Sequence, residues 1–325
     1  MLRIDKLLYL SDCISIHLPL HGSVILKSYD SCVVRSLNLI IANFFLCGVI
    51  LMNEQEAYEF DRQGYIIIRD ILDSDQIMAL AKSIDLLEEH ALVHVESPPR
   101  KKSAWGTEYH VSEEKGYHVQ GERAEGKTLI IEDFWNSDSK FDFLVNHART
   151  MSYINNIVKS RPTINNSEIR IRYRGNATGS HGGSRAANQK YRYSYGENGI
   201  DCMMVRIVYF VHDCNNEQGA FCVVPGTHKT NIPCPYGSNP DEEPGMIGLE
   251  VSAGDAILFT EHLRHGGFTN NSNQVRKTLH VGYGPHWMMS QNIATMDEPQ
   301  YITENTFDRF DEAQRELFLA WPPRD

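Results

Sequence analysis

The segment Gly254–Leu279, GDAILFTEHLRHGGFTNNSNQVRKTL, holds residues whose types and order could do chemistry. An apolar run over 256–259 is followed by His265 and, eleven residues later, by Arg276. An imidazole at the end of a rigid strand is well placed to bind a metal ion. The planar guanidinium of arginine pairs with a carboxylate through two parallel hydrogen bonds. The segment therefore predicts a metal ligand and a carboxylate clamp, positioned by one strand and the turn after it.

The elements that hold these residues change character near Glu168. Before this point apolar residues recur on one helical face, and helices are expected over 54–63, 74–89 and 140–158, with a short strand over 64–72. After it the period becomes two, which predicts strands over 169–174, 204–211, 220–224, 247–251, 256–259 and 277–283. A last helix is expected over 311–319, ahead of Pro322. This order predicts a mainly β fold with flanking helices, in which the strands form a barrel or sandwich.

Composition excludes several classes of protein. The 325 residues are 42% apolar, which is enough for a sizeable core. The net charge of −11 argues against a nucleic-acid groove, which would need a basic face. Seven cysteines, an odd number with no C-x-x-C pair, indicate free thiols in a reducing compartment. We therefore expect a cytoplasmic protein whose partner is a small molecule and not a nucleic acid.

The first 52 residues differ from the rest, and we assign them to an N-terminal extension that precedes a globular domain over 53–325. They end in Ser36–Met52, a 17-residue apolar run that is short for a membrane span. Three interpretations stay open: a stretch upstream of a true start at Met52, a signal anchor, or a targeting segment. A membrane is not expected unless residues 36–52 anchor the chain.

One motif match is rejected on physical grounds. Gly121–Thr128, GERAEGKT, fits the phosphate-loop pattern G-x-x-x-x-G-K-[ST]. Two of its residues are glutamates, which would repel phosphate, and a strand-like run follows where the motif requires a helix. The surrounding residues Pro98–Gly126 are charged and contain Pro and Gly, so we expect a long loop or flap there.

Four segments resemble the phytanoyl-CoA dioxygenase (PhyH-like) family of Fe(II)/2-oxoglutarate oxygenases. They are FDRQGYIIIRDIL at Phe60–Leu72, HGG at His181–Gly183, GAFCVVPGTHK at Gly219–Lys229, and Gly254–Leu279. The resemblance implies a double-stranded β-helix, a jelly-roll or cupin-like barrel, that uses Fe(II), 2-oxoglutarate and O₂ and releases succinate and CO₂. It also implies that His181 and His265 ligate iron and that Arg276 holds the far carboxylate of 2-oxoglutarate. Two other histidines, His228 and His262, are expected to pack near the site without ligating.

The chain departs from the family at one position. The family usually has an aspartate two residues after the first histidine, and this chain has Gly183, which offers no ligand atom. The replacement that we expect is Glu261, four residues before His265 and in phase with Ile257 and Phe259. Two alternatives remain: a halogenase that binds chloride at the vacated position, or a barrel that lost its metal site and binds a ligand without catalysis.

The most direct expectation is a dioxygenase that hydroxylates a small organic molecule. The substrate itself is not identified by the sequence. The 98–126 flap and the polar run Arg185–Tyr195 are expected to contact it, with Arg185, Tyr191 and Arg192 as candidates. These cations suggest an anionic substrate, and a solvated loop is the competing interpretation.

Overall fold

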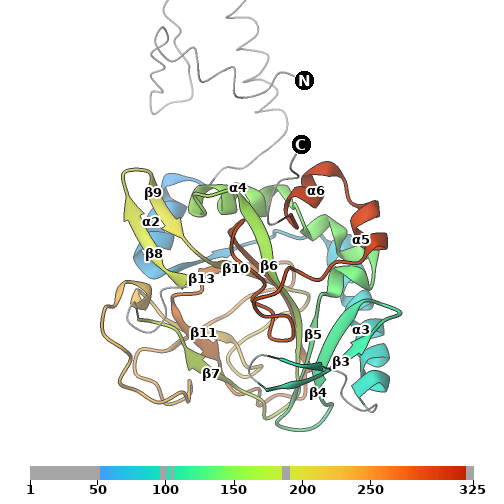
Figure 1. Cartoon of the computed structure of the whole chain (residues 1–325). Helices are drawn as coiled ribbons and strands as arrows, with labels where there is room; N and C mark the ends of the chain where they lie inside the picture. The colour runs from blue at the N-terminus through green and yellow to red at the C-terminus, as the bar shows by residue number, and fades with distance from the viewer. Residues whose placement is uncertain (1–51, 96–100, 104–105, 185–190, 320–325) are drawn as a thin grey trace, which may run out of the picture. The chain divides into compact units, whose positions relative to one another are not determined.

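A large antiparallel sheet forms the framework of the chain (Figure 1). The computed structural model describes residues 52–95, 101–103, 106–184 and 191–319. In these residues the large sheet has nine strands in the order β1-β13-β10-β15-β6-β5-β4-β3-β2. Their bounds are β1 Tyr65–Ile68, β2 Lys101–Lys102, β3 Glu108–Ser112, β4 Tyr117–Gly121, β5 Thr128–Glu132, β6 Pro162–Arg172, β10 Val205–Phe210, β13 Ala256–Thr260 and β15 Arg276–Pro285.

A smaller sheet faces the inner strands of the large one. Its order is β12-β11-β14-β7, and every neighbouring pair is antiparallel. The bounds are β7 Thr178–His181, β11 Phe221–Val224, β12 Ile247–Leu249 and β14 Arg264–Gly267. A separate hairpin joins β8 Tyr193–Gly196 to β9 Gly199–Cys202. Two facing antiparallel sheets confirm the mainly β, double-stranded β-helix fold that the sequence predicts.

The alternation of side chains along the strands creates two hydrophobic cores. On β13, Ala256 and Leu258 belong to the core that includes helix side chains such as Leu80. Ile257 and Phe259, on the opposite face, pack in a second cluster with β11 residues between the two sheets. Successive side chains of a strand point to opposite faces, and β1, β10 and β13 accordingly contribute to both cores. The inner cluster ends where the polar residues of the site begin.

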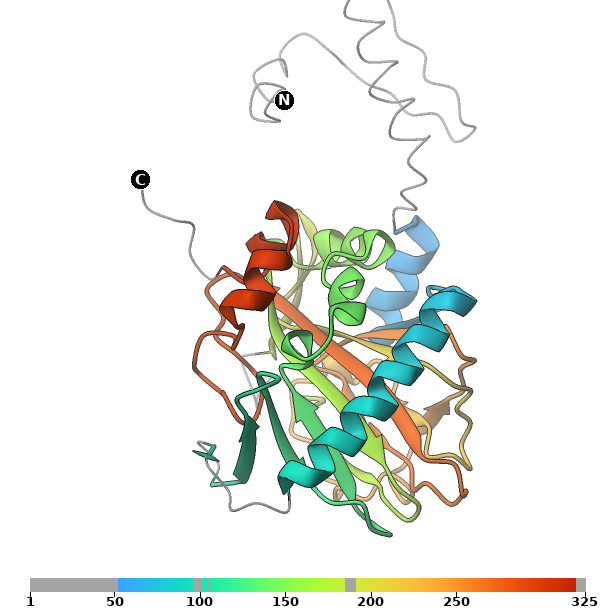
Figure 2. The same cartoon turned by 90° about the vertical axis from the view of Figure 1, so that its right-hand side faces the viewer.

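Helices cover the outer face of the large sheet, and α3 crosses this face diagonally in Figure 2. The α-helices are α2 Glu54–Gln63, α3 Ser74–Val95, α4 Ala148–Ile157, α5 Glu304–Arg309 and α6 Glu312–Glu316, and the 3-10 helices are η3 Phe134–Asn136, η4 Ser139–Leu144 and η6 Thr227–Lys229. Helix α2 begins at a capping box formed by Asn53 and Glu56. It ends at Gly64, whose φ of 84° is a left-handed conformation that suits glycine. A Cβ at Gly64 would lie 2.5 Å from Nδ1 of His228, so the glycine also leaves space for the imidazole ring of this histidine.

Three expectations about the elements were wrong. The described parts of Pro98–Gly126 are not a flap but carry β2, β3 and β4, because Tyr109, Tyr117 and Val119 are fully buried despite the charges around them. The 140–158 helix is divided into η4 and α4, since His147, with φ −50° and ψ 120°, lies outside the helical region and caps α4. The last helix is shorter than 311–319 and follows α5, which the sequence pattern did not indicate.

Other expectations were met or lie outside the description. Residues 121–128 connect β4 to β5, a strand and not a helix, which confirms the rejection of the phosphate-loop match. Of the apolar run 36–52, only Met52 is described. No helix within the described ranges has the length and apolar character needed to cross a membrane.

Candidate active site

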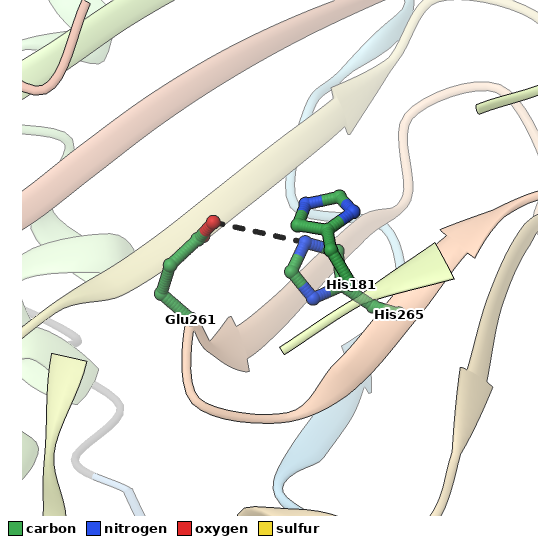
Figure 3. Close-up of side chains that lie close together, drawn as sticks. All are labelled: His181, Glu261 and His265. Carbon is green, nitrogen blue, oxygen red and sulfur yellow. Dashed lines mark ion pairs between the residues drawn. The ribbon is translucent and has the colours of Figure 1, made fainter. Parts of the chain in front are cut away.

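The smaller sheet brings the two predicted histidines together. In the pairing of β7 with β14, His181 and His265 are direct partners across the ladder. Their ring centroids lie 4.1 Å apart. The ring of His265 also packs against Phe221 and Phe259, at centroid distances of 5.7 and 4.7 Å. Strand pairing therefore places the two imidazoles next to each other (Figure 3), and both line the same cavity.

Hydrogen bonds to the backbone decide which ring nitrogen each histidine presents. Nδ1 of His181 lies 2.8 Å from the carbonyl oxygen of Gly179, and Nδ1 of His265 lies 2.7 Å from that of Leu263. A carbonyl only accepts, so each Nδ1 carries the proton and donates it. Each Nε2 is then left with a lone pair. This arrangement is typical of metal-binding histidines, whose second nitrogen is oriented by a backbone carbonyl.

Glu261 completes the group from the turn that connects β13 to β14. Its Oε1 lies 3.7 Å from Nε2 of His265, and Figure 3 shows the carboxylate directed at the imidazoles. One ligand atom from each of His181, Glu261 and His265 lies within 4.8 Å of the others. Oε2 of Glu261 is 3.2 Å from Nε of Arg206, but this ion pair lacks hydrogen-bond geometry and leaves the buried oxygen without a hydrogen bond. Two imidazoles and one carboxylate are a donor set that suits a divalent transition metal.

Two glycines explain why the carboxylate comes from this turn. Gly182 and Gly183 have φ values of 77° and 81°, which residues with side chains rarely adopt. A Cβ on Gly182 would lie 2.4 Å from the carbonyl oxygen of Leu263, so its absence lets the turn approach the end of β7. A Cβ on Gly183 would lie 2.6 Å from Cβ of Arg264. The aspartate that is missing from position 183 would therefore be strained and would collide with Arg264.

Both histidines are neutral in this environment. Burial lowers the pKa of His265 well below its ordinary value, and the neighbouring His181 lowers it further. Burial also lowers the pKa of His181, although part of this residue is exposed to solvent. Metal binding requires the unprotonated imidazole. The site is thus prepared for a cation at neutral pH.

The cavity beyond the histidines is lined by arginines from the large sheet. The sequence pattern correctly predicts a strand with one apolar and one polar face over 169–174. Its polar face was expected to be exposed to solvent, but in the structure this face points into the barrel. Sequence reasoning therefore missed several lining residues, and the alternating arginines next to the Arg276 strand were the available signal. These residues are Arg170, Arg172, Arg206, Thr278 and His280.

Arg276 lies in the same cavity as the metal-binding group. It is 3% exposed, and its Nη1 donates to the carbonyl oxygen of Gly219 at 2.8 Å. Its Nε is buried without a hydrogen-bond partner. Its guanidinium carbon lies 6.0 Å from the centre of the Phe210 ring. The structure thus brings together four predicted site residues: His181, Glu261, His265 and Arg276.

The predicted substrate contacts are only partly near this cavity. Tyr191 is half-buried, and its hydroxyl donates to Oε1 of Gln291 at 3.2 Å. Burial raises the pKa of Tyr191 to about 12, with a further contribution from the charge of Glu261. Arg192 is instead exposed and forms a 3.6 Å ion pair with Asp201 of the β8–β9 hairpin. Arg185 lies outside the described residues.

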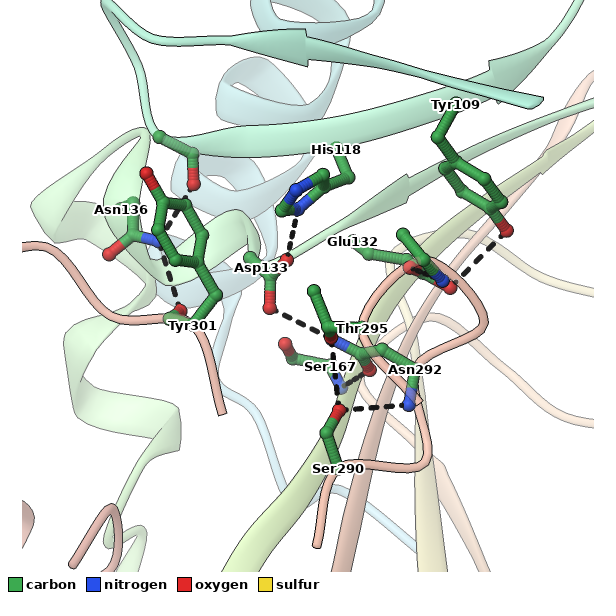
Figure 4. Close-up of polar contacts among 12 residues, drawn as sticks. Tyr109, His118, Glu132, Asp133, Asn136, Ser167, Ser290, Asn292, Thr295 and Tyr301 are labelled. Carbon is green, nitrogen blue, oxygen red and sulfur yellow. Dashed lines mark hydrogen bonds and ion pairs between the residues drawn. The ribbon is translucent and has the colours of Figure 1, made fainter. Parts of the chain in front are cut away.

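The segment after β15 is bound to the large sheet by buried polar contacts (Figure 4). Oε1 and Oε2 of Glu132 accept from the backbone of Ile293 and Ala294 at 2.7 and 2.8 Å. Asn292 donates to Asp133 at 2.8 Å and accepts from the backbone of Ser167 at 2.8 Å. Burial raises the pKa of Glu132 well above its ordinary value. These contacts fix the segment that holds Gln291, the partner of Tyr191.

Comparison with known proteins identifies the family. The profile of the phytanoyl-CoA dioxygenase (PhyH) family matches residues 60–278. The chain belongs to the PhyH family. Membership confirms the resemblance noted in the sequence and the expected enzyme class, a non-haem iron oxygenase that uses 2-oxoglutarate and O₂. In this PhyH chain His228 is buried, and its Nε2 lies 3.0 Å from the carbonyl oxygen of Asp61. Both observations agree with its expected packing role.

Solved structures show the same fold at low sequence identity. HygX from Streptomyces hygroscopicus, with nickel and 2-oxoglutarate bound, is 18% identical and has a TM-score of 0.59, covering 73% of this chain and 89% of that chain. HygX with nickel, 2-oxoglutarate and hygromycin B bound is 17% identical, with a TM-score of 0.57 and the same coverage. The 2-oxoglutarate-dependent carbocyclase SnoK from nogalamycin biosynthesis is 14% identical, with a TM-score of 0.50 over 74% of this chain and 87% of that chain. A search of curated proteins gave no significant match.

Proposed function

We propose that this PhyH protein is an Fe(II)/2-oxoglutarate-dependent dioxygenase that hydroxylates a small organic substrate. In this proposal His181, Glu261 and His265 hold the iron. The observation that carries it is the convergence of two lone-pair Nε2 atoms and one buried carboxylate within 4.8 Å. The three ligands would occupy one face of the metal and leave positions open for co-substrate and O₂.

Each residue of the site has a defined task in this proposal. When bound, iron supplies the oxidising chemistry with O₂ as 2-oxoglutarate is decarboxylated to succinate. Arg276 holds the distal carboxylate of 2-oxoglutarate through charge-assisted hydrogen bonds. Arg206, whose Nε lies 3.2 Å from Oε2 of Glu261, places a positive charge beside this carboxylate. Phe221 and Phe259 fix the ring of His265 and keep water from that side.

The geometry favours hydroxylation over halogenation. A halogenase needs an open position on the metal where the family aspartate would bind. Here a side-chain position at Gly183 points to Arg264 and not to the histidines, while Glu261 supplies a carboxylate from another direction. Chloride therefore has no vacated ligand position to fill. The assembled donors also favour an enzyme over a barrel that only binds a ligand.

A small substrate is supported by HygX, whose structure holds hygromycin B together with 2-oxoglutarate. In this chain Tyr191, beside the segment 290–303, remains our candidate for substrate contact. Arg192 is a weaker candidate because it is exposed and paired with Asp201, and Arg185 remains a candidate from the sequence alone. We also propose that residues 53–325 form the catalytic domain and that the enzyme works in the cytoplasm.

The proposal is tested by anaerobic titration of the protein with Fe(II) and 2-oxoglutarate. A saturable visible charge-transfer band is expected from the chelated complex. Glu261→Gln should weaken Fe(II) binding by at least about ten-fold, because a neutral amide is a poor replacement for a buried carboxylate ligand. Glu250→Gln is the matched control, since Glu250 is exposed and outside the cavity. The band should be indifferent to chloride.

Three outcomes would contradict the proposal. Absence of the band in folded wild-type protein would show that the site does not bind the cofactor pair. Unchanged Fe(II) affinity in Glu261→Gln would remove Glu261 from the ligand set. A chloride-dependent spectrum would favour the halogenase.

A further inference from the structure

Two buried arginines lie side by side in the cavity. Arg172 on β6 and Arg276 on β15 are direct partners across the antiparallel ladder. They are 2% and 3% exposed. Both line the cavity that contains His181 and His265. Two guanidinium groups that share one buried space would normally require compensating negative charge.

The other cavity arginines have such compensation. Nε of Arg170 lies 2.6 Å from Oε2 of Glu168, and Nη1 of Arg206 lies 3.8 Å from the same oxygen. Neither Arg172 nor Arg276 has an ion pair with any acidic side chain in the described part of the chain. Burial lowers the pKa of Arg172 well below its ordinary value, and the nearby charge of Arg276 adds to this effect. The pair thus carries two uncompensated charges.

Neutral contacts fix the orientation of Arg172 without satisfying its charge. Its Nε donates to Oδ1 of Asn176 at 2.9 Å, and its Nη2 lies 3.4 Å from the carbonyl oxygen of Gly267. A Cβ on Gly267 would lie only 2.3 Å from Nη1 of Arg172. Glycine at position 267 therefore provides the space that the guanidinium occupies. No hydrogen bond within the described residues uses Nη1 of Arg172.

We propose that Arg172 and Arg276 together bind the distal carboxylate of 2-oxoglutarate, and that Arg172 makes the site selective for a dicarboxylic 2-oxoacid. This inference rests on the proposed function. A carboxylate has about four lone-pair sites, enough to accept from two guanidinium groups at once. The co-substrate then supplies the negative charge that the protein lacks at this point. A monocarboxylic 2-oxoacid would leave both guanidinium charges uncompensated.

The test compares 2-oxoglutarate with 2-oxopentanoate, which has the same carbon number but no distal carboxylate. Affinity is measured from the anaerobic Fe(II) charge-transfer band. Arg172→Met should weaken 2-oxoglutarate binding by roughly ten- to a hundred-fold, the usual effect of losing a hydrogen bond between charged groups. Binding of 2-oxopentanoate should not weaken. Arg174→Met is the control, because Arg174 is exposed, pairs with Asn273 and does not line the cavity.

Thermal unfolding of the metal-free protein gives a readout that does not depend on turnover. Without ligand, Arg172→Met should be at least as stable as wild type, since it removes one of two uncompensated buried charges. It should lose most of the stabilisation that 2-oxoglutarate gives to wild type. A purely structural arginine would show the opposite pattern, with lower stability and an unchanged response to the ligand.

Two further variants keep the test decisive if Arg172→Met does not fold. Arg172→Lys retains the charge without the planar fork and should show an intermediate loss of 2-oxoglutarate affinity. Gly267→Ala should displace Arg172 and weaken 2-oxoglutarate selectively. The inference is overturned if these variants bind both acids as wild type does, or lose both equally. Failure of wild type itself to bind 2-oxoglutarate would instead refute the proposed function.

Discussion

Gly183→Asp, which places the family's usual aspartate two residues after His181, is expected to destabilise this chain without strengthening iron binding. The reason lies in the local backbone. Gly183 has a φ of 81°, and its amide donates to the carbonyl oxygen of His262 at 2.9 Å. A Cβ there would lie 2.6 Å from Cβ of Arg264, and not near the histidine nitrogens.

The expected loss has two parts. An aspartate in the left-handed region costs about 1 kcal/mol, at the low end for residues other than glycine. The collision with Arg264 can be relieved only by moving this side chain, which also forms a 2.8 Å ion pair with Glu243. This shift destabilises the folded state by a further ~1–3 kcal/mol, which matches the cost at other overpacked sites. The total is about 3 kcal/mol. For a domain of this size it corresponds to a fall in Tm of about 6–12 °C.

The assay is thermal and chemical unfolding together with anaerobic Fe(II) titration. Gly199→Asp is the matched control, because Gly199 has a φ of 84° and nothing within 4 Å of its Cβ position. It should show the conformational part of the loss alone. The difference between the two variants then measures the collision with Arg264.

One result would refute this reasoning. A Gly183→Asp protein that is as stable as wild type and binds Fe(II) more tightly would show that position 183 faces the metal. In that case adding Glu261→Gln should leave the affinity high, and Glu261 would not be the ligand.

Three other perturbations have definite expected outcomes. Glu88→Gln should lower the free energy of unfolding by about 1–3 kcal/mol above pH 4.5, because the lowered pKa of Glu88 reflects hydrogen bonds from Lys277 and Tyr173 that outweigh its burial. The difference should shrink as pH falls through the lowered pKa of the folded state. Asn292→Ala should cost about 1–3 kcal/mol in urea unfolding, since it leaves the buried amide of Ser167 unpaired. Protein that begins at Met52 should fold and bind Fe(II) as the full chain does.

Each of these expectations can fail in a specific way. A constant Glu88→Gln effect from pH 7 to pH 3 would mean that ionisation of Glu88 does not contribute. Asn198, which is exposed, gives a control for the loss of an asparagine side chain, and equal effects of Asn198→Ala and Asn292→Ala would dismiss the buried network. An insoluble Met52-start protein would assign residues 1–51 a part in folding.

The sequence by itself determined much of the framework. Period-two alternation after Glu168 predicted the main strands, because a strand between two layers needs opposite faces. The resemblance of the segments that carry His181, His265 and Arg276 to the PhyH-like family indicated the enzyme class. The sequence did not predict β3 and β4, because polar and charged neighbours surround their buried side chains Tyr109 and Tyr117.

Only the tertiary structure decided how the site is completed. Alternation has a period but does not say which face is inward, so the polar face of β6 could be assigned to the cavity only when the second sheet was in place. The sequence singled out Glu261 as a candidate ligand, but only the structure shows how the left-handed Gly182 and Gly183 let its turn lie against β7. Convergence of atoms from distant segments depends on register and close packing, which act across the sheets and leave no periodic signal in the chain.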